Sequence, residues 1–549
     1  MAGDSTQTRG AAVLRGVAAV VAGLGAGELV AGLVPPHASP VAAVAGVLVD
    51  LAPTWAKELG IQLFGAWDKV AIVVAIAIVV IGLGALAGAL ERTRPPAGMV
   101  LVALLGVLGL VAALARGGSP VSAVPGLVGL AVAVVAFWLL PRAARRSSVT
   151  AAVVPDADAG PQPRVASALA AVPVPSIAPV PSTQPALPTA PAGHGRRAFL
   201  AWAGVVTAAG ALAAVGGAAM SGLVRARTVV VSALRLPTPV RAAAAIPAAA
   251  ELGIPGLAPV VTPVADFYRV DTAFIVPSLA PEDWRLRIHG RVDAEVELGW
   301  DELMALDFEE FDVTLMCVSN PVGGPYTGNA RWLGTRIRPL VELAGPQPEA
   351  DMVLSQSVDG WTASTPLDVL LEPDRAAILA VAMNGEALTP EHGAPVRMVV
   401  PGLYGYVSAT KWVTELEVTR FDEKRAYWTR GGWAERGPVK LQSRIDVPRP
   451  GKPVHAGPTR IAGVAWHQHV GVSGVEVRID AGPWQPAELA EAIGVDTWVQ
   501  WHLAWDPSPG EHTLAVRAIG ADGEVQTGAV RSVLPDGATG YHSIRVFVV

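Results

Sequence analysis

The sequence predicts a multidomain protein in which transmembrane α-helices come first, a mixed α+β domain follows, and an immunoglobulin-like β-sandwich ends the chain. Hydrophobic residues make up 52% of the 549 residues and only 16% are charged, and the apolar excess lies before residue 225. That balance is too apolar for a purely soluble protein. Beyond residue 250 strand-like and helix-like patterns interleave, and beyond residue 459 only strand-like patterns remain, which indicates the other two domains.

Five apolar runs approach the roughly 20 residues that span a bilayer. They cover residues 14–34, 70–90, 98–114, 124–140 and 198–224. The first four form a predicted membrane domain over residues 1–146, in which the short third and fourth runs are separate spans or a hairpin packed between the others. Between the first two runs, an amphipathic piece around residues 55–67 favours an interfacial helix over a sixth span.

Arginine positions predict the orientation of these spans. Arginines flank the start of the first run and follow the second and fourth runs: Arg9, Arg15, Arg92, Arg94, Arg142, Arg145 and Arg146. The positive-inside rule makes these clusters cytoplasmic, so we expect a multi-pass plasma-membrane protein with its C-terminal half outside. Glu28 lies within the first run and is either a functional carboxylate or a snorkelling or paired one.

Residues 147–195 are rich in Ala, Pro, Ser and Val, a composition that predicts a semi-extended linker without a core. Arg196 and Arg197 follow it, so residues 196–227 read as a fifth transmembrane helix with a start like that of a twin-arginine export signal. Such a signal is a receptor-read address, and it would mean that the downstream domain takes up its cofactor before export. Alternatively, the two arginines mark the cytoplasmic end of the fifth span.

The remainder has the composition of a globular protein. Residues 284–290 alternate as a strand does, and residues 299–304 read as a turn into a short helix. Interleaved patterns predict a mixed α+β domain over residues 250–445. Short strands at 475–480, 498–504, 513–518 and 544–549, separated by turn residues, predict an immunoglobulin-like domain over residues 450–549.

Several kinds of function find no support in the sequence. The net charge of −6 argues against a nucleic-acid partner. Neither a phosphate-cradling GxxxxGK[ST] segment nor the GxSxG elbow of serine hydrolases occurs. His467 and His469 stand two residues apart, a spacing that fits a surface strand face better than a zinc site.

The single cysteine, Cys317, is the sharpest chemical residue. It follows a strand-like run at 311–316 and precedes a segment rich in Gly, Pro and Asn, which cannot continue a strand or a helix. One cysteine forms no intramolecular disulfide, so Cys317 is an incidental apolar residue or a chemical group. A thiol at a strand end facing an irregular loop favours a metal ligand.

The segment around Cys317 resembles the sulfite oxidase family of molybdenum enzymes. Residues 314–320, Thr-Leu-Met-Cys-Val-Ser-Asn, and residues 329–337, Asn-Ala-Arg-Trp-Leu-Gly-Thr-Arg-Ile, carry the likeness. It continues through four further motifs, at residues 383–388, 391–397, 400–405 and 411–412. Ordered motifs over this length are more specific than a lone cysteine, and the resemblance covers residues 250–549 and none of the membrane part.

The resemblance implies a sulfite-oxidase-type molybdopterin domain, with Cys317 as the metal ligand of a molybdenum-molybdopterin cofactor. Two-electron oxygen-atom transfer is the chemistry of that cofactor. Family positions that would contact the pterin or its phosphate fall on Tyr268, Arg269, Asp359, His392, Arg397, Ser408, Thr410 and Lys411. Without that context, His392 and Arg397 would read as a turn with solvated charges.

The resemblance breaks down at the substrate end. Two arginines follow the Cys-x-x-Asn segment in eukaryotic sulfite oxidases, whereas Pro321 and Val322 stand there in this chain. Losing a charge-assisted contact to a small dianion costs on the order of several kcal/mol, so a standard sulfite oxidase is not expected. Trp361 stands where those enzymes carry an active-site tyrosine, and it joins Cys317, Tyr404 and Arg331 as a catalytic candidate.

The expected partners follow from this assignment. They are the lipid bilayer, a small-molecule substrate, and a separate electron-transfer partner, such as a quinone or a cytochrome, because no haem domain is recognised in the sequence. The family's C-terminal β-domain supports dimerisation, which implies a homodimer. The alternative is a non-catalytic, membrane-tethered interaction protein built on a retired enzyme domain.

Overall fold

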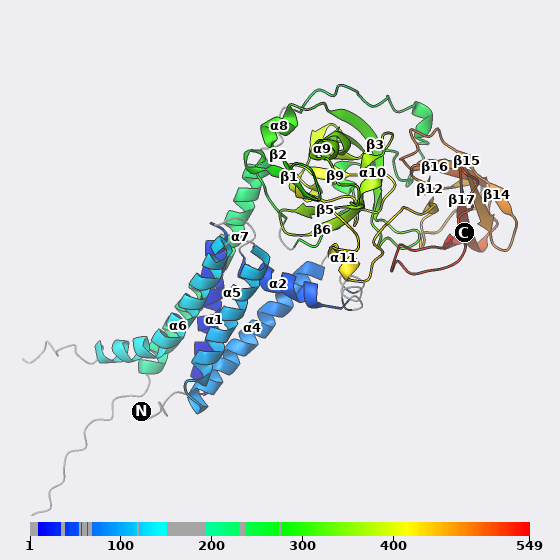
Figure 1. The fold of residues 1–549 in the computed structure, drawn as a ribbon. Helices are drawn as coiled ribbons and strands as arrows, with labels where there is room; N and C mark the ends of the chain where they lie inside the picture. Colours follow the sequence, from blue (N-terminus) through cyan, green and yellow to red (C-terminus); the bar gives the residue numbers. More distant parts are fainter. Residues whose placement is uncertain are drawn as a thin grey trace, which may run out of the picture. The chain divides into compact units, whose positions relative to one another are not determined.

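The computed structural model divides the chain into two compact units (Figure 1). Residues 1–45 and 67–220 form one unit, and residues 46–66 and 221–549 form the other. The described residues are 9–33, 39–53, 56, 63, 68–117, 120–150, 194–229, 236–273 and 276–549. Nearly all of the predicted linker at 147–195 lies outside the described residues, as does most of the amphipathic piece predicted around 55–67.

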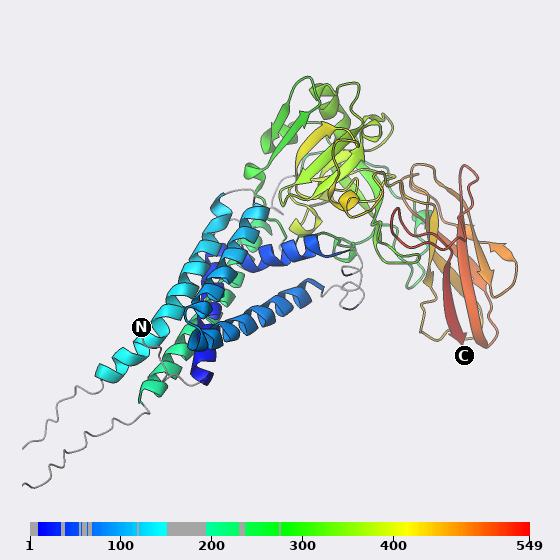
Figure 2. The same ribbon diagram turned by 60° about the horizontal axis from the view of Figure 1, so that its bottom comes forward.

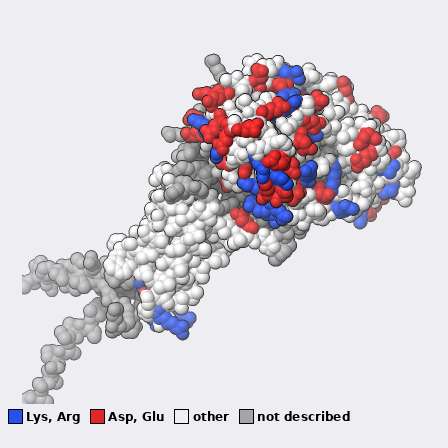
Figure 3. Space-filling view, in the orientation of Figure 1, with Lys and Arg blue, Asp and Glu red and all other residues white. Residues whose placement is uncertain are grey.

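The first unit is helical, and it contains the five predicted spans. Its long helices are α1 (Arg9–Ala31), α4 (Asp68–Thr93), α5 (Ala97–Gly117), α6 (Ala123–Thr150) and α7 (His194–Val229). Each contains a stretch long and apolar enough to cross a membrane. Their outer faces expose aliphatic side chains such as Ile78, Leu108 and Leu212, and the visible surface of the bundle is almost free of charged side chains (Figure 3).

Small residues let the helices of this unit approach closely. A Cβ atom added to Gly23 of α1 would lie 2.6 Å from the Cβ of Ala133 in α6, and one added to Gly210 of α7 would lie 2.7 Å from the carbonyl oxygen of Val21. Such contacts between small residues are the usual means of packing helices in a bilayer. The α5 and α6 helices also pack against each other, the arrangement that a hairpin of the third and fourth spans requires.

A short helix, α2 (Pro40–Leu51), follows the first span. It lies earlier in the chain than the predicted amphipathic piece and is apolar along most of its length. The Glu28 carboxylate accepts hydrogen bonds from the Ser39 hydroxyl at 2.9 Å and from the Val41 N–H at 3.2 Å. Glu28 therefore caps the first turn of α2, which favours the paired alternative for this carboxylate.

The second unit contains an antiparallel sheet and a mixed sheet together with short helices, which confirm the α+β prediction. The first has the order β3-β4-β7-β8, with β9 beside β7; its strands are β3 (Glu309–Met316), β4 (Thr327–Arg336), β7 (Ile378–Met383), β8 (Glu386–Ala387) and β9 (Arg397–Val399). The second has the order β2-β1-β10-β5-β6; its strands are β1 (Arg285–Gly290), β2 (Val296–Gly299), β5 (Met352–Ser357), β6 (Thr362–Pro366) and β10 (Val413–Thr419).

Short helices complete this domain: α8 (Trp300–Met304), α9 (Ile337–Ala344), α10 (Leu367–Leu371) and α11 (Tyr427–Arg430). The α9 helix buries Ile337, Leu340 and Val341, the i, i+3 and i+4 positions of one face. A common core joins them to both sheets and includes the fully buried Trp284. Apolar burial of this kind is the main force that holds the strand ends of the site in place.

The C-terminal part consists of two four-stranded antiparallel sheets (Figure 2). One has the order β11-β12-β16-β15 and contains β11 (Gln442–Val447), β12 (Thr459–Trp466), β15 (Glu488–Leu489) and β16 (Val499–Trp505). The other has the order β14-β13-β17-β18 and contains β13 (Val472–Ile479), β14 (Trp484–Pro486), β17 (Gly510–Gly520) and β18 (His542–Val548). An apolar core that includes Trp501 and Leu514 draws on both sheets. This β-rich region agrees with the predicted strands, and its immunoglobulin-like topology stays a prediction.

The C-terminal part completes the hydrogen bonding of strand β3. The Thr314 N–H donates to Asp496 O at 3.0 Å, and the Thr314 hydroxyl accepts from the Trp498 N–H at 2.9 Å. The Gln468 side chain donates to Thr314 O. Because these groups are buried, leaving them unpaired would cost about 1–3 kcal/mol each. The strand that leads to Cys317 therefore depends on both parts of the unit.

Candidate cofactor site

Cys317 lies immediately after β3, at the start of a closed loop. Its N–H donates to Tyr326 O at 3.0 Å, and the Asn320 side chain accepts from the Tyr326 N–H at 2.9 Å. The thiol lies 2.9 Å from the Ser319 hydroxyl. Burial raises the pKa of the Cys317 thiol, so without a bound cation it stays protonated. Metal binding would favour the thiolate, which is the ligand form.

Tyr404 lies beside this strand end. The N–H of the next residue, Gly405, donates to Met316 O at 3.0 Å. Burial is the main cause that raises the pKa of Tyr404 to about 12; the charge of Asp536 adds to it, and a thiolate at Cys317 would add further. The phenol ring packs on Gly537, where an added Cβ would lie 2.8 Å from the hydroxyl oxygen. Tyr404 is therefore a buried side chain near Cys317, and its phenol is uncharged.

Arg397 of β9 is a buried cation. It is 6% exposed, donates to His392 O at 3.1 Å, and lies with its guanidinium carbon 4.9 Å from the centre of the Trp332 ring. Within the described part of the chain no carboxylate pairs with it. Burial lowers the pKa of Arg397 to about 10, because a charge removed from water is destabilised. An anionic ligand beside the guanidinium would compensate this buried positive charge.

Tyr268 is near enough to both Cys317 and Arg397 to interact electrostatically with each of them. Burial raises the pKa of Tyr268 strongly, a thiolate at Cys317 would act in the same direction, and the charge of Arg397 opposes both. Its ring stacks on Phe267 with centroids 5.3 Å apart. Phe267 in turn meets the His392 ring edge-on at 5.8 Å. The aromatic pair therefore joins the thiol end of the site to its cationic end.

Lys411 and Arg269 share one carboxylate. The Lys411 ammonium and the Arg269 guanidinium each lie 2.8 Å from the same oxygen of Asp271. Burial lowers the pKa of Lys411 to about 8 despite that partner. With Arg397, the three cations outnumber the nearby carboxylates of Asp271 and Glu391, so the group keeps a net positive charge. A net positive charge favours an anionic ligand such as a phosphate, which carries about −1.5 to −2 near pH 7.

His392 lies among these cations and is neutral. Its Nε2 atom lies 3.1 Å from Val264 O. Burial, followed by the charge of Arg397, lowers the pKa of His392 to about 4. A neutral imidazole can offer one N–H donor to a ligand without adding charge.

Ser408 and Thr410 stabilise the loop before Lys411 through hydrogen bonds of their buried hydroxyls. The Ser408 hydroxyl donates to Tyr404 O at 3.0 Å, and its N–H donates to Gly405 O at 3.3 Å. The Thr410 hydroxyl lies 2.7 Å from the hydroxyl of Ser355. Both side chains are fully buried. Their hydroxyls, and the Ser408 N–H that the resemblance offered to a phosphate, are thus already engaged within the protein.

Asp359 and Trp361 lie in the turn between β5 and β6. The Asp359 carboxylate accepts from the Ser357 hydroxyl and, at 3.3 Å, from the Trp361 N–H. The Val358 N–H donates to Trp412 O at 2.9 Å. The turn therefore borders the residue that follows Lys411, and these contacts tie both candidates to the cationic end of the site.

Arg331 lies away from the other candidates. Thr327 pairs with Met316, and Arg331 pairs with Asp312 four residues further along β4, which is about 13 Å at the usual rise of a strand. The Arg331 guanidinium bonds both oxygens of the Asp312 carboxylate at 3.0 and 2.8 Å, and this pairing raises its pKa. These contacts favour a structural ion pair over a catalytic role.

Sequence reasoning missed two residues of the site. Asp271 shares its carboxylate between two cations, and Ser319 contacts the thiol. Asp271 could have been proposed from the sequence, because it stands two residues after Arg269 in the same short segment. No sequence pattern pairs it with Lys411, which lies 140 residues later.

The residues present fit a cofactor that joins a sulfur-binding metal to a phosphate. A thiol stands at one end, an unneutralised buried cation group stands at the other, and an aromatic pair lies between them. These features define a class, that of proteins binding a phosphate-bearing metal cofactor.

Comparisons with known proteins specify that class. The profile of the oxidoreductase molybdopterin-binding domain matches residues 273–428. The oxidoreductase YuiH of Bacillus subtilis is 36% identical over 154 residues, which are 28% of this chain and 74% of that protein. The mitochondrial sulfite oxidase of Macaca fascicularis is 30% identical over 328 residues, which cover 50% of this chain. The match spans 59% of the length of the macaque enzyme.

Over this segment the chain belongs to the sulfite oxidase family of molybdopterin-dependent oxidoreductases. Its cofactor is molybdenum-molybdopterin. A solved structure, that of the sulfane dehydrogenase SoxCD from Paracoccus pantotrophus, matches 49% of this chain and 74% of that chain at 24% identity, with a TM-score of 0.44.

Proposed function

We propose that this protein is a membrane-anchored oxidoreductase that performs two-electron oxygen-atom transfer on a small substrate, with Cys317 as the protein ligand of molybdenum. The buried Arg397, which has no carboxylate partner among the described residues, carries the proposal. A retired enzyme domain would gain nothing from retaining an unneutralised charge inside its core, because such a charge destabilises the empty protein.

In this proposal the cationic group binds the phosphate of the cofactor. Arg397 and Lys411 donate charge-assisted hydrogen bonds, which are among the stronger contacts available to a protein. Asp271 holds Lys411 and Arg269 in position by bonding both. His392 offers an uncharged donor beside them.

The remaining residues hold the reacting end of the cofactor. When bound, the cofactor supplies the oxygen-atom transfer chemistry. The Cys317 thiol would lose its proton on binding the metal, and the Ser319 hydroxyl, 2.9 Å away, would stabilise the thiolate by hydrogen bonding. Phe267 and Tyr404 are buried and exclude water from the space between the thiol and the phosphate group.

The loop after Cys317 supports a substrate other than sulfite. No residue from Val318 to Ala330 is charged. Arg444 reaches this loop and donates to Gly324 O at 3.2 Å, but Asp446 pairs with its guanidinium at 2.6 Å. An arginine neutralised in this way offers little to a dianion, so we propose a small substrate that is neutral or weakly charged.

The membrane part of the proposal rests on the five apolar helices and on the arginine positions. They support a multi-pass plasma-membrane anchor with the catalytic domain on the extracytoplasmic side. Electrons would pass to or from a separate partner, a quinone or a cytochrome. The C-terminal β-rich region would support a homodimer.

Metal and pterin analysis of the purified protein tests the function. We expect molybdenum and a pterin in equal amounts, and one sulfur ligand fewer in the molybdenum X-ray absorption spectrum of Cys317→Ser. Ser319→Ala is the matched control, since it removes the hydroxyl beside the thiol and leaves the sulfur count unchanged. Another metal without pterin, or an unchanged sulfur count in Cys317→Ser, would contradict the proposal. Full cofactor without turnover of any oxygen-atom donor or acceptor would favour the non-catalytic alternative.

A further inference from the structure

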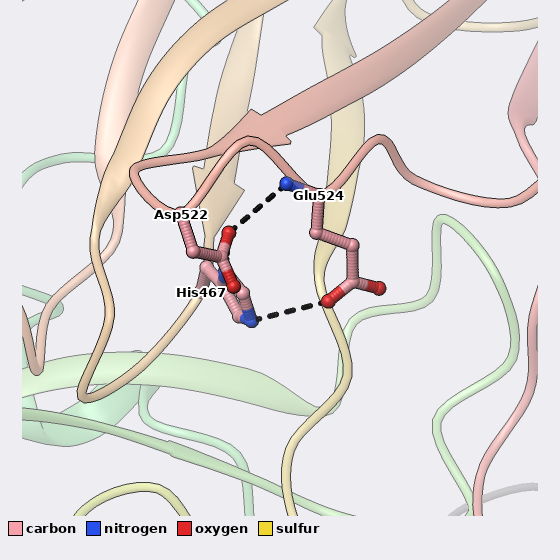
Figure 4. Close-up of side chains that lie close together, drawn as sticks. All are labelled: His467, Asp522 and Glu524. Carbon is pink, nitrogen blue, oxygen red and sulfur yellow. Dashed lines mark hydrogen bonds and ion pairs between the residues drawn. The ribbon is translucent and has the colours of Figure 1, made fainter.

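Three metal-binding side chains converge in the C-terminal part, outside the site described above. His467 follows β12, and Asp522 and Glu524 lie in the turn after β17 (Figure 4). The imidazole Nδ1 atom lies 3.9 Å from an Asp522 oxygen, and Nε2 lies 3.8 Å from a Glu524 oxygen. One ligand atom from each residue can be chosen so that all three lie within 4.8 Å of one another.

His467 is buried after the end of β12 and, contrary to the sequence prediction, does not lie on a surface strand face, and one of its ring nitrogens lacks a hydrogen bond among the described residues. His467 is 8% exposed, and its Nδ1 atom makes no hydrogen bond within the described residues. A buried imidazole nitrogen without a partner is energetically unfavourable. The two facing carboxylates are about half exposed, with exposed side-chain fractions of 49% and 59%. They can shift toward an ion that also takes the imidazole nitrogen.

The backbone around these side chains is fixed by hydrogen bonds. The Gly471 N–H donates to His467 O at 2.7 Å, and the Ala521 N–H donates to Gly471 O at 3.0 Å, so the two loops are joined. The turn itself is closed by Gly520, whose N–H donates to Glu524 O at 2.8 Å. A Cβ at Gly520 would lie 2.6 Å from the His467 Nδ1 atom. The chain therefore keeps this position free of a side chain next to the cluster.

We propose that His467, Asp522 and Glu524 bind a divalent transition-metal ion. Two carboxylates and a neutral imidazole present a charge of −2, which a divalent cation neutralises. One imidazole with two carboxylates suits zinc or manganese, whereas magnesium and calcium prefer oxygen ligands alone. One ring nitrogen binds the ion, and solvent completes its coordination.

The ion would have a structural role, because the residue next to His467 forms a hydrogen bond with strand β3, which ends just before Cys317. Gln468 donates to Thr314 O in β3 and, at 2.8 Å, to Asp496 O. Fixing His467 therefore fixes the side chain that holds the strand ending before Cys317. The site lies in the β-rich region, and its existence does not depend on the proposed function.

The test uses untagged, full-length protein loaded with molybdenum cofactor, and measures uptake of Zn²⁺ and Mn²⁺ by calorimetry and by metal analysis after dialysis. We expect one ion per chain beyond molybdenum, a rise in the unfolding temperature that saturates with the ion, and no effect of Mg²⁺. Asp522→Asn with Glu524→Gln, and separately His467→Gln, should weaken binding about tenfold or more. A far-ultraviolet circular dichroism spectrum like that of the wild type verifies that the carboxylate variant folds.

Glu488→Gln is the matched control. Glu488 is an exposed acid that lies 3.5 Å from His502 in the same region, so its loss should leave binding unchanged. X-ray absorption at the zinc edge should show one imidazole in the wild type. The inference fails if the wild type takes up neither ion, or if the carboxylate variant keeps wild-type affinity. It also fails if only pH, and no added ion, shifts the unfolding temperature, because His467 is then an imidazolium between two acids.

Discussion

Replacing Arg397 with methionine should stabilise the empty protein and weaken its hold on the cofactor. Methionine has a similar reach, so the change removes charge and donors more than volume. In the empty protein the guanidinium is buried without a carboxylate partner in the described part of the chain. In the loaded protein it would face phosphate. The substitution should therefore raise the stability of the empty protein and lower that of the loaded protein.

The structure sets the magnitudes. Burial lowers the pKa of Arg397 from 12.5 to about 10, and at about 1.4 kcal/mol per pKa unit the buried charge costs about 3 kcal/mol. Methionine loses the hydrogen bonds to His392 O and Met398 O, worth about 1 kcal/mol each. The empty protein should gain about 1 kcal/mol. The loaded protein should lose a charge-assisted contact of about 2 kcal/mol, or roughly thirtyfold in cofactor affinity.

The assay compares protein made with and without molybdate. Unfolding is followed by tryptophan fluorescence in detergent, and molybdenum is counted per chain after dialysis. Arg338→Met is the control, because Arg338 forms an exposed pair with Glu342 and its loss should change stability by less than about 0.5 kcal/mol. A variant that is less stable when empty, or that retains cofactor as the wild type does, would refute the reasoning.

Three further predictions follow from named contacts. The pKa of His392 is about 4 when folded and about 6.5 when unfolded, so the empty protein should lose stability as the pH falls from about 6.5 to 4, and His392→Gln should flatten this slope in unfolding curves. Thr314→Val leaves the Trp498 N–H without its acceptor and the Asn329 side-chain oxygen without its donor, and should lower the unfolding free energy by about 2–4 kcal/mol; a change under about 0.5 kcal/mol in denaturant titration would contradict this. Arg331→Leu should cost about 1–2 kcal/mol by breaking the Asp312 pair yet leave kcat unchanged, and a tenfold loss of kcat would restore Arg331 as a catalytic candidate.

The sequence was most informative where one residue type dominates a long segment. Apolar length alone predicted the five helices, because a bilayer span needs a continuous run and little else. The helix α2 was not predicted, since Glu28 stabilises its N-terminal end at Ser39, a contact between residues that no local pattern reveals.

For the site, the motif around Cys317 predicted the chemistry, and long-range pairing limited the rest. Arg331 stood in a matching motif, but its neighbour across the sheet is Asp312, and strand register is not readable from one strand. Asp271 went unassigned because its partner Lys411 is distant in the chain. Local motifs predict which residues belong to a site, whereas the carboxylate that pairs with each cation can be identified only in the folded structure.

The bond from Trp498 to Thr314 joins residues 184 positions apart, and this separation orders the events of biosynthesis. A ribosome adds residues from the N-terminus, so strand β3 emerges long before the segment that completes its hydrogen bonds. Until that segment is made, the strand end that carries Cys317 lacks part of its support. We therefore expect cofactor insertion to follow synthesis of nearly the whole chain, and a truncated product ending before the C-terminal β-rich region to bind less cofactor.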